Sequence, residues 1–272
     1  MQQMNRILAV CNEYEKCDGL IDTVAKMAKG HGAGVTLMYV HEVSLFELPF
    51  FNKEEGLEHQ KLRRELEERA VAAGIEEPAI LIFEDDTADH VAEEAGKEAD
   101  TLIVTTYAGK PTQKILRKIS TPVLVIKEAI HLYTKAVVAL DAVMPERCLN
   151  FMQRFFKGVD LHLYQDFQYI PLPSVDPVVE PFDVGMDASI YLELMSAKQE
   201  AFQEFCKERG LKGTFETGEN GIDEDTVAFV KKVDADLLVL APLDRDTMLG
   251  DAIEDIVEKS PVDTLVCYEH QG

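Results

Sequence analysis

The chain has 272 residues, of which 46% are hydrophobic, and a formal net charge of −23 at pH 7. This composition excludes general disorder, and the excess of acids excludes ligands such as DNA, whose phosphates need clustered lysine and arginine. No apolar run reaches the ~20 residues of a membrane-spanning helix, and the amino-terminal residues lack a secretory pattern. We therefore expect a cytoplasmic protein that binds neither nucleic acid nor membrane.

The cysteines favour the same compartment. There are five of them, an odd number, and they are scattered along the chain without a paired spacing: Cys11, Cys17, Cys148, Cys206 and Cys267. Four of the five lie in apolar strand or helix patterns, so we expect small core residues rather than a metal or redox site. Unpaired cysteines are typical of a reducing compartment.

The first half alternates predicted strands and helices. Unbroken apolar runs predict strands at 6–11, 35–40, 79–83, 100–104 and 121–125. Between them, apolar residues recurring every three or four positions predict helices at 20–29 and 58–73 and a helix that begins with a cap at Thr87. Strands that are apolar on both faces indicate a parallel sheet covered by helices on both sides.

The second half repeats this order. Strands are predicted at 135–140, 161–164, around Phe215, at 236–240 and at 263–266, and helices at 145–157, at 189–209 and from Asp223 or Thr226 onward. The matching order of elements indicates an internal duplication. The predicted fold class is α/β, with two tandem doubly wound, Rossmann-like, five-stranded parallel-sheet domains at residues 1–130 and 131–272.

Two short segments carry a family resemblance. Residues 121–125 read Thr-Pro-Val-Leu-Val, and residues 250–257 read Gly-Asp-Ala-Ile-Glu-Asp-Ile-Val. With the strand order and spacing, they make nearly the whole chain similar to a tandem member of the universal stress protein family. The resemblance implies a binding or regulatory role in the stress response, with an unidentified protein partner. It also implies that the fifth strands, within 122–127 and 264–268, pair inside one chain, and a homodimer is a further possibility.

ATP-binding members of that family carry Gly-x-x-Gly, nine residues, then Gly-Ser or Gly-Thr, between the fourth strand and fourth helix. Glycines there let backbone amides approach phosphates at a helix amino terminus. In the first half this loop is short, and Gly109 stands at the last glycine with Lys110 in the place of the hydroxyl. Asn12, Thr105, Thr106, Gly109 and Lys110 could hold a small phosphate or an adenine nucleotide. Helix capping and turn chemistry are the alternative reading.

In the second half, Ala241 and Asp244 replace the first two glycines, Gly250 remains, and Asp251 replaces the hydroxyl. Asp141 ends the neighbouring first strand, so a cofactor here would contact Asp141 and Gly250. Asp244, Asp246 and Asp251 are expected to gather near Asp141 at this edge and to repel a triphosphate, since one unit charge ~4 Å from another costs about 4 kcal/mol at an effective dielectric of ~20. Asp141, Asp244 and Asp251 could instead hold a divalent ion such as Mg²⁺, or the acids could lie in a solvated loop.

Neither half matches the full ATP motif, so we expect a protein that binds rather than catalyses. The alternative from another class is an adenine-nucleotide-binding protein or slow ATPase that uses the first-half residues with a metal. A third possibility is a carrier of a small apolar ligand beneath the phenylalanine-containing loops at 46–51 and 167–182.

Overall fold

A computed structural model describes residues 6–41, 55–84, 86–98, 100–127, 133–141, 144–168, 184–218 and 220–269. The first half contains, in order, β1 (Arg6–Cys11), η1 (Tyr14–Lys16), α1 (Cys17–His31), β2 (Gly34–His41), α2 (Glu55–Ala72), β3 (Ala79–Glu84), α3 (Thr87–Ala95), β4 (Thr101–Thr106), α4 (Lys110–Lys118) and β5 (Val123–Ile126). The second half contains β6 (Lys135–Leu140), α5 (Glu146–Phe155), β7 (Asp160–Phe167), α6 (Val184–Arg209), β8 (Lys212–Thr217), α7 (Ile222–Val233), β9 (Leu237–Ala241), α8 (Met248–Lys259) and β10 (Asp263–Val266).

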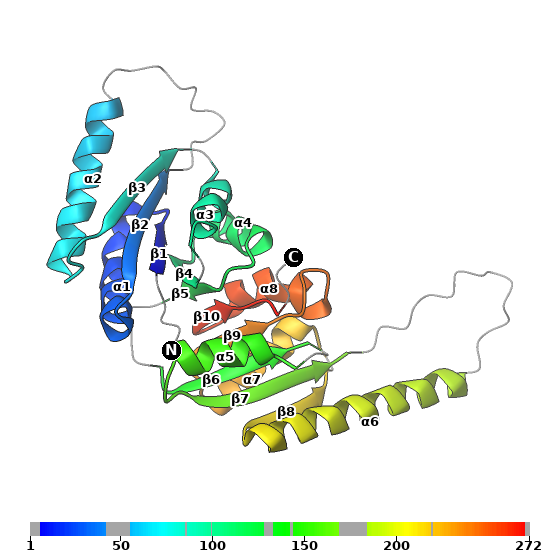
Figure 1. Cartoon of the computed structure of the whole chain (residues 1–272). Helices are drawn as coiled ribbons and strands as arrows, with labels where there is room; N and C mark the ends of the chain where they lie inside the picture. Colours follow the sequence, from blue (N-terminus) through cyan, green and yellow to red (C-terminus); the bar gives the residue numbers. More distant parts are fainter. Residues whose placement is uncertain are drawn as a thin grey trace, which may run out of the picture.

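The strands form one continuous sheet of ten strands in the order β3-β2-β1-β4-β5-β10-β9-β6-β7-β8 (Figure 1). Neighbouring strands within each half are parallel, and the fold class is the predicted one. β10 pairs with β5 at the centre, as the family resemblance implied, and the pairing is antiparallel. The predicted domain boundary after residue 130 falls within 128–132, outside the described residues, and stays a prediction.

Helices cover both faces of the sheet. Apolar side chains of α1, α2, α5 and α6 pack on one face, and those of α3, α4, α7 and α8 pack on the other. Each core continues from one half into the other through the central strands, with Leu124 and Leu265 on the first face and Val125 and Val266 on the second. Burial on both faces is the physical reason why the strands are unbroken apolar runs.

The central junction also carries polar contacts. Arg117 of α4 forms an ion pair with Glu254 of α8, and the Tyr268 hydroxyl donates to the carbonyl of Leu116 at 3.1 Å. Because this hydroxyl is buried, its hydrogen bond fixes the end of the second half on the first. The two halves are therefore held by a shared sheet, shared cores and side-chain contacts.

The predicted elements are confirmed, with differences at their ends. The cap of α3 is Asp86, whose carboxylate accepts from the amides of Ala88 and Asp89, whereas the predicted cap Thr87 is the first residue of the helix. β7 runs on to Phe167, beyond the predicted end at residue 164, because it pairs with β8 along this length. No helix in the part of the chain that the structure describes has the length and apolar character to cross a bilayer.

Candidate functional site

The predicted site residues lie at the carboxyl ends of parallel strands, where open α/β sheets bind ligands. Asn12 follows β1, which is adjacent to β4, and Asp141 follows β6, which is adjacent to β9. The helix after the fourth strand of each half, α4 or α8, begins at the same edge. Two equivalent sites can therefore be compared, one for each half of the chain.

In the second half, the Asp141 carboxylate lies at the amino terminus of α8. One oxygen accepts from the amide of Leu243 at 2.9 Å and from the hydroxyl of Thr247 at 2.6 Å. The other accepts from the amide of Leu249 at 3.2 Å. Thr247 is itself the cap of α8, since its hydroxyl accepts from the amide of Gly250 at 3.1 Å. The amides that a bound phosphate would use are thus already paired with groups of the protein itself.

Gly250 has a packing role at this position. A Cβ atom there would collide with the backbone oxygens of Asp244 and Arg245, because the loop before α8 passes directly over the helix. Glycine is therefore required for the close approach of two backbone segments. In the family motif, glycine lets the backbone approach phosphates. Here Gly250 instead lets the backbone of α8 approach the loop that precedes it.

The metal prediction gains no support at this edge. The Asp141 oxygens are used by the α8 terminus, the Asp244 carboxylate accepts from the amide of Arg245 at 2.6 Å, and Asp251 is exposed. Within the described ranges, no group of three or more His, Cys, Asp or Glu residues is arranged to hold a metal ion. A metal-binding role of Asp141, Asp244 and Asp251 therefore stays a prediction without support in the described part of the chain.

Cations that the sequence reading missed partly offset the acids. A cavity of about 230 Å³ between α4 and α8 is lined by two cations, Arg117 and Arg245, and by three acids, Asp246, Asp251 and Glu254. The predicted site residues Gly250 and Asp251 both line it. The Arg245 guanidinium lies 4.9 Å from the centre of the Tyr268 ring and donates to the Ser120 hydroxyl at 3.0 Å. The acids expected at this edge are therefore interspersed with arginines. The hydrogen bonds that already occupy the amides of α8 remain an obstacle to phosphate.

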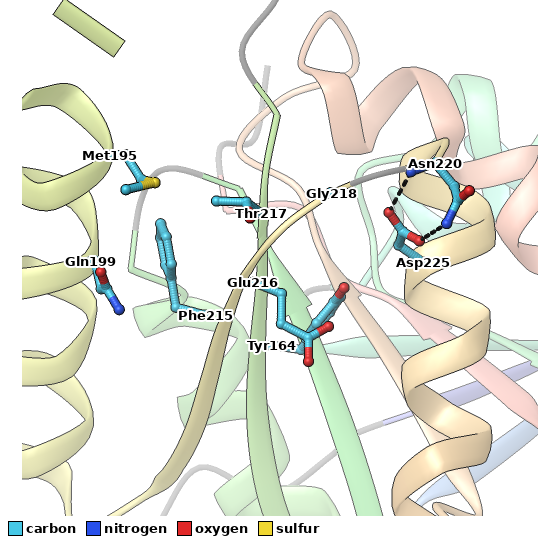
Figure 2. A pocket seen from close by; sticks show the side chains of 9 residues that line it. All are labelled: Tyr164, Met195, Gln199, Phe215, Glu216, Thr217, Gly218, Asn220 and Asp225. Atoms are coloured by element: carbon cyan, nitrogen blue, oxygen red, sulfur yellow. Dashed lines mark hydrogen bonds between the residues drawn. The ribbon is translucent and has the colours of Figure 1, made fainter. Parts of the chain in front are cut away.

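The sequence reading also missed a second cavity, of about 540 Å³, at the carboxyl ends of β7 and β8 (Figure 2). It is bounded by α6 on one side and by the first turn of α7 on the other. None of the predicted site residues lines it. The only signal for it in the sequence is the string of acids and aromatic residues on these two strands, which is indistinguishable from an ordinary amphipathic pattern.

In the first half, the structure brings Asn12 and the two threonines to one edge. The Asn12 amide donates to the Thr87 hydroxyl at 2.9 Å, while its buried carbonyl oxygen has no hydrogen-bond partner in the described part of the chain. Thr105 is fully buried, and its hydroxyl lies 3.0 Å from the carbonyl of Val10. Thr105 is therefore committed to the sheet, and Thr106, which is partly exposed, is the more accessible hydroxyl.

The amino terminus of α4 differs from that of α8. Gly109 precedes the helix with a φ of 68°, a conformation that favours glycine, and no side chain among the described residues caps this end. Exposed Lys110 is the first residue of α4. In contrast to the second half, no carboxylate within the described ranges takes the place of a phosphate at this helix end.

A cavity of about 390 Å³ lies beside these residues. Thr106 and Tyr107 line it together with two basic residues, Lys16 and Lys127. The Lys127 ammonium lies 4.0 Å from the centre of the Tyr107 ring, and burial lowers the pKa of this lysine. Of the five residues predicted for this site, only Thr106 lines the cavity, so the binding role of the others stays a prediction.

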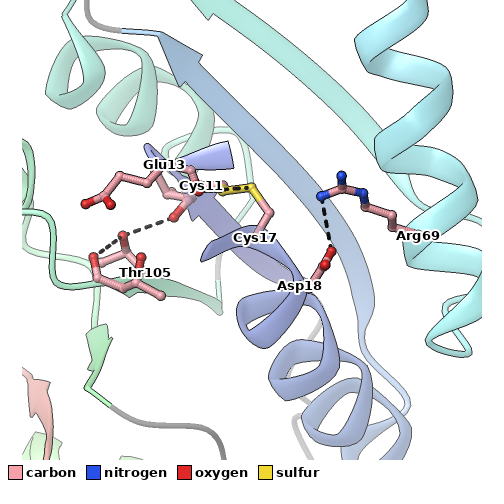
Figure 3. The surroundings of a disulfide bond; sticks show 8 residues. Cys11, Glu13, Cys17, Asp18, Arg69 and Thr105 are labelled. Atoms are coloured by element: carbon pink, nitrogen blue, oxygen red, sulfur yellow. Dashed lines mark hydrogen bonds and ion pairs between the residues drawn. A yellow bond between two sulfur atoms is a disulfide. The ribbon is translucent and has the colours of Figure 1, made fainter. Parts of the chain in front are cut away.

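A disulfide between Cys11 and Cys17 corrects the expectation of five unpaired cysteines. Their Cα atoms are 5.8 Å apart, and the bond joins the end of β1 to the start of α1 (Figure 3). Cys148, Cys206 and Cys267 are free and buried, as expected. The closed loop includes Asn12, so the disulfide restrains the residue that ends β1 at the candidate site. The reducing compartment inferred from unpaired cysteines loses this support.

Comparisons with known proteins bear on the fold. No protein-family profile and no curated protein matches the chain. A solved structure of a universal stress protein from Archaeoglobus fulgidus matches with a TM-score of 0.67 at 15% identity, over 98% of this chain and 97% of that chain. The chain has the tandem universal stress protein fold. A protein of unknown function from Pseudomonas aeruginosa has the same architecture, with a TM-score of 0.60 at 17% identity, over 97% and 92% of the two chains.

The universal stress protein fold places both candidate sites at comparable edges, yet their chemistry differs. In the second half Asp141 and Thr247 pair the α8 amides, whereas in the first half the α4 terminus has Gly109 and Lys110. Thr247 is not among the residues predicted for this site, although a threonine directly before a helix is a familiar capping signal.

Proposed function

We propose that the chain is a member of the universal stress protein family that acts in the stress response by binding a ligand or a protein partner, without turning over a substrate. The fold supports the family assignment. The observation that carries the functional part is the set of hydrogen bonds from the amides of Leu243 and Leu249 and the hydroxyl of Thr247 to the Asp141 carboxylate. An enzyme that uses ATP in the second half needs these donors for phosphate.

The physical argument is one of competition. A helix amino terminus binds anions through its unpaired amides and its dipole. Here the Asp141 carboxylate already accepts hydrogen bonds from these amides, and it does so at no cost in association entropy because it belongs to the same chain. A triphosphate has to displace this carboxylate from the amides, and its own negative charge is then close to that of Asp141. At an effective dielectric of ~20, two unit charges ~4 Å apart repel by about 4 kcal/mol. We therefore expect no polyphosphate binding at α8.

Calorimetric titration with ATP, with and without Mg²⁺, tests this proposal. We expect at most one nucleotide per wild-type chain. Two nucleotides per wild-type chain contradict the proposal. So does a crystal soaked with ATP in which the three phosphates lie against Gly250 and the amides of α8.

A second candidate function is adenine-nucleotide binding, or slow ATP hydrolysis, in the first half. Three observations favour it: the uncapped start of α4, the unpaired carbonyl oxygen of Asn12, and the cavity lined by Lys16 and Lys127. Residues Asn12, Thr106, Gly109 and Lys110 are the proposed contacts, with the backbone at Gly109 and the Lys110 ammonium facing phosphate. Thr105 has a supporting role in this proposal.

A charge reversal separates the two candidates. If the first half binds nucleotide, Lys110→Glu weakens ATP binding at least ~10-fold, since a favourable contact of about 1.4 kcal/mol is lost. Lys26→Glu, at an exposed position on α1, is the matched control and leaves the affinity unchanged. Phosphate release measured on the wild type then distinguishes a slow ATPase from a binding protein. Equal affinity in both variants rules out Lys110 as a contact.

A further inference from the structure

A cavity of about 800 Å³ lies where α5 faces the first half of the chain. One wall is a side of α5, and the other includes Thr101, at the start of β4, and Pro122, directly before β5. Cys267, directly after β10, completes the lining; because β5 and β10 run antiparallel, the start of one meets the end of the other here. The cavity shares no lining residue with the three described above. Both halves contribute to it, and ligand sites are frequent at such domain interfaces.

α5 presents a row of polar and aromatic side chains to this cavity. Arg147, Asn150, Phe151 and Arg154 line it, and their spacing of three or four residues puts them on one side of the helix. The apolar side chains of α5, such as that of Met152, are buried in the core instead. α5 therefore has two faces: one packs on the sheet, and the other forms the wall of the cavity.

Arg147 is a half-buried cation with unused hydrogen-bond donors at this wall. Its Nη1 atom donates to the backbone carbonyl of Tyr268, which leaves the donors on Nε and Nη2. Among the described residues, Arg147 forms no ion pair with a carboxylate. The carboxylate of Glu269, which follows Tyr268, accepts instead from the backbone amides of Arg147 and Cys148, both at 2.9 Å. The amides at the start of α5 are thus occupied, and the guanidinium is the group that an anion in the cavity would contact.

The two acids of the cavity wall have arginine partners. Asp100 pairs with Arg154 at 3.6 Å, and Glu98 pairs with Arg6 at 3.8 Å. Arg147 and Arg154 are two helical turns apart, roughly 10 Å along the axis, so the Asp100 pair lies toward the other end of the cavity. The Arg147 end therefore attracts a negative charge, in a chain whose net charge of −23 disfavours anions in general.

Phe151 supplies an apolar surface next to this cation. It follows Arg147 by about one helical turn, ~6 Å along the axis, and its ring packs on that of Phe155 with the centres 4.5 Å apart. Pro122 lines the cavity from the other half of the chain. A guanidinium group one turn away from an aromatic ring matches a ligand in which a carboxylate is attached directly to a ring.

We propose that this cavity binds a small aromatic carboxylate, whose carboxylate group is held by the Arg147 guanidinium and whose ring lies against Phe151 and Pro122. Arginine binds carboxylates through two parallel hydrogen bonds, which are stronger than hydrogen bonds between neutral groups. The volume of about 800 Å³ lies within the range of small-molecule sites. The site goes beyond the proposed function, because it involves none of the residues considered for nucleotide binding.

Fluorescence titration with naphthalene-2-carboxylate tests the proposal, with naphthalene-2-carboxamide as the uncharged probe of nearly the same shape. The chain has no tryptophan, so tryptophan emission does not overlap the naphthalene signal. We expect saturable binding of one carboxylate per chain, and binding of the carboxamide that is at least ~10-fold weaker. Arg147→Gln is expected to weaken carboxylate binding at least ~10-fold, and Phe151→Leu roughly 3- to 10-fold.

Arg64→Gln is the matched control, because it removes one positive charge from an exposed position on α2 that does not line the cavity. If carboxylate affinity falls equally in Arg64→Gln and Arg147→Gln, only the net charge of the chain matters, and the proposal is wrong. Unchanged affinity in Arg147→Gln, or equal binding of the two probes by the wild type, also overturns it. If Arg147→Gln fails to fold, a wild-type crystal soaked with the carboxylate locates the probe, and density away from Arg147 contradicts the proposal.

Discussion

The carboxylate of Asp141 and the hydroxyl of Thr247 lie 2.6 Å apart across the gap between β6 and α8. Through this contact the first strand of the second half caps a helix more than a hundred residues later in the chain. The Asp141 carboxylate thus stands where a bound anion would lie at the start of α8. It stabilises the fold at the edge where open α/β sheets bind ligands. Its removal therefore has an energetic consequence that can be measured.

Replacement of Asp141 by alanine is expected to lower the free energy of unfolding by about 1–3 kcal/mol, because the amides of Leu243 and Leu249 lose their acceptor. Asp246→Ala is the matched control, since Asp246 is exposed in the same loop, and its effect should stay within about 0.5 kcal/mol. Urea denaturation followed by circular dichroism measures both. Equal stability of the two variants contradicts the capping role.

Gly250→Ala is expected to destabilise the protein by about 1–3 kcal/mol, since the added methyl group meets the backbone oxygens of Asp244 and Arg245. Gly30→Ala, in α1, has open space around the new Cβ atom and is expected to stabilise by about 0.5–1 kcal/mol. Thermal unfolding of the two variants gives opposite shifts if the packing argument holds. A neutral Gly250→Ala variant shows that the loop before α8 can move aside.

Reduction of the Cys11–Cys17 disulfide is expected to lower stability by about 2 kcal/mol, the chain-entropy value for a loop of this length. Alkylation of the denatured, unreduced protein should label three thiols, those of Cys148, Cys206 and Cys267. In Cys17→Ala, a reductant should leave the unfolding midpoint unchanged. Labelling of all five thiols in freshly purified protein shows that the bond is absent.

Asp166 gives the protein a pH-dependent stability. Burial raises its pKa to about 6, with contributions from Asp225 and Glu216 against the hydrogen bonds from Gln168 and Gly218. Because the folded-state pKa exceeds the unfolded value of about 3.9, the folded state binds the proton more tightly. The contribution is fully present below pH ~4 and is lost as the pH rises through about 6.

Asp166→Asn, which mimics the neutral carboxyl group, should therefore stabilise the protein at pH 8 by about 1 kcal/mol, a value reduced for partial solvent exposure. At pH 4 its effect should be near zero. Urea denaturation at the two pH values measures the difference. A variant with the same effect at both pH values shows that folding does not raise the pKa of Asp166.

The sequence predicted the architecture well because the strands are long apolar runs. β1 and β6 have the predicted bounds, and the pairing of β5 with β10 is the one that the family resemblance implied, although its antiparallel direction was not predicted. The binding role of the site residues stays untested. The third possibility, an apolar carrier, rests on residues 46–51 and 167–182, nearly all of which lie outside the described ranges.

Other features depend on where a loop folds back, which residue types alone do not specify. The Cys11–Cys17 bond requires the turn at η1, which brings two Cα atoms to 5.8 Å. The contacts of Asp141 require the backbone at Leu243 and Leu249 to aim its amides across a strand end. The position of the Asp166 carboxylate requires a residue without a side chain at 218, because a Cβ atom on Gly218 would lie 2.6 Å from one of its oxygens. Each of these is a tertiary relationship between short segments.

The antiparallel contact of β5 with β10 has a consequence for how such a protein can evolve. Two identical subunits paired by the same contact must carry every substitution twice, once in each site. A chain that supplies both partners from one gene is free of this restriction. Asn12 and Asp141, which occupy matching positions, could therefore diverge independently, one half gaining an internal anion while the other keeps an open helix end.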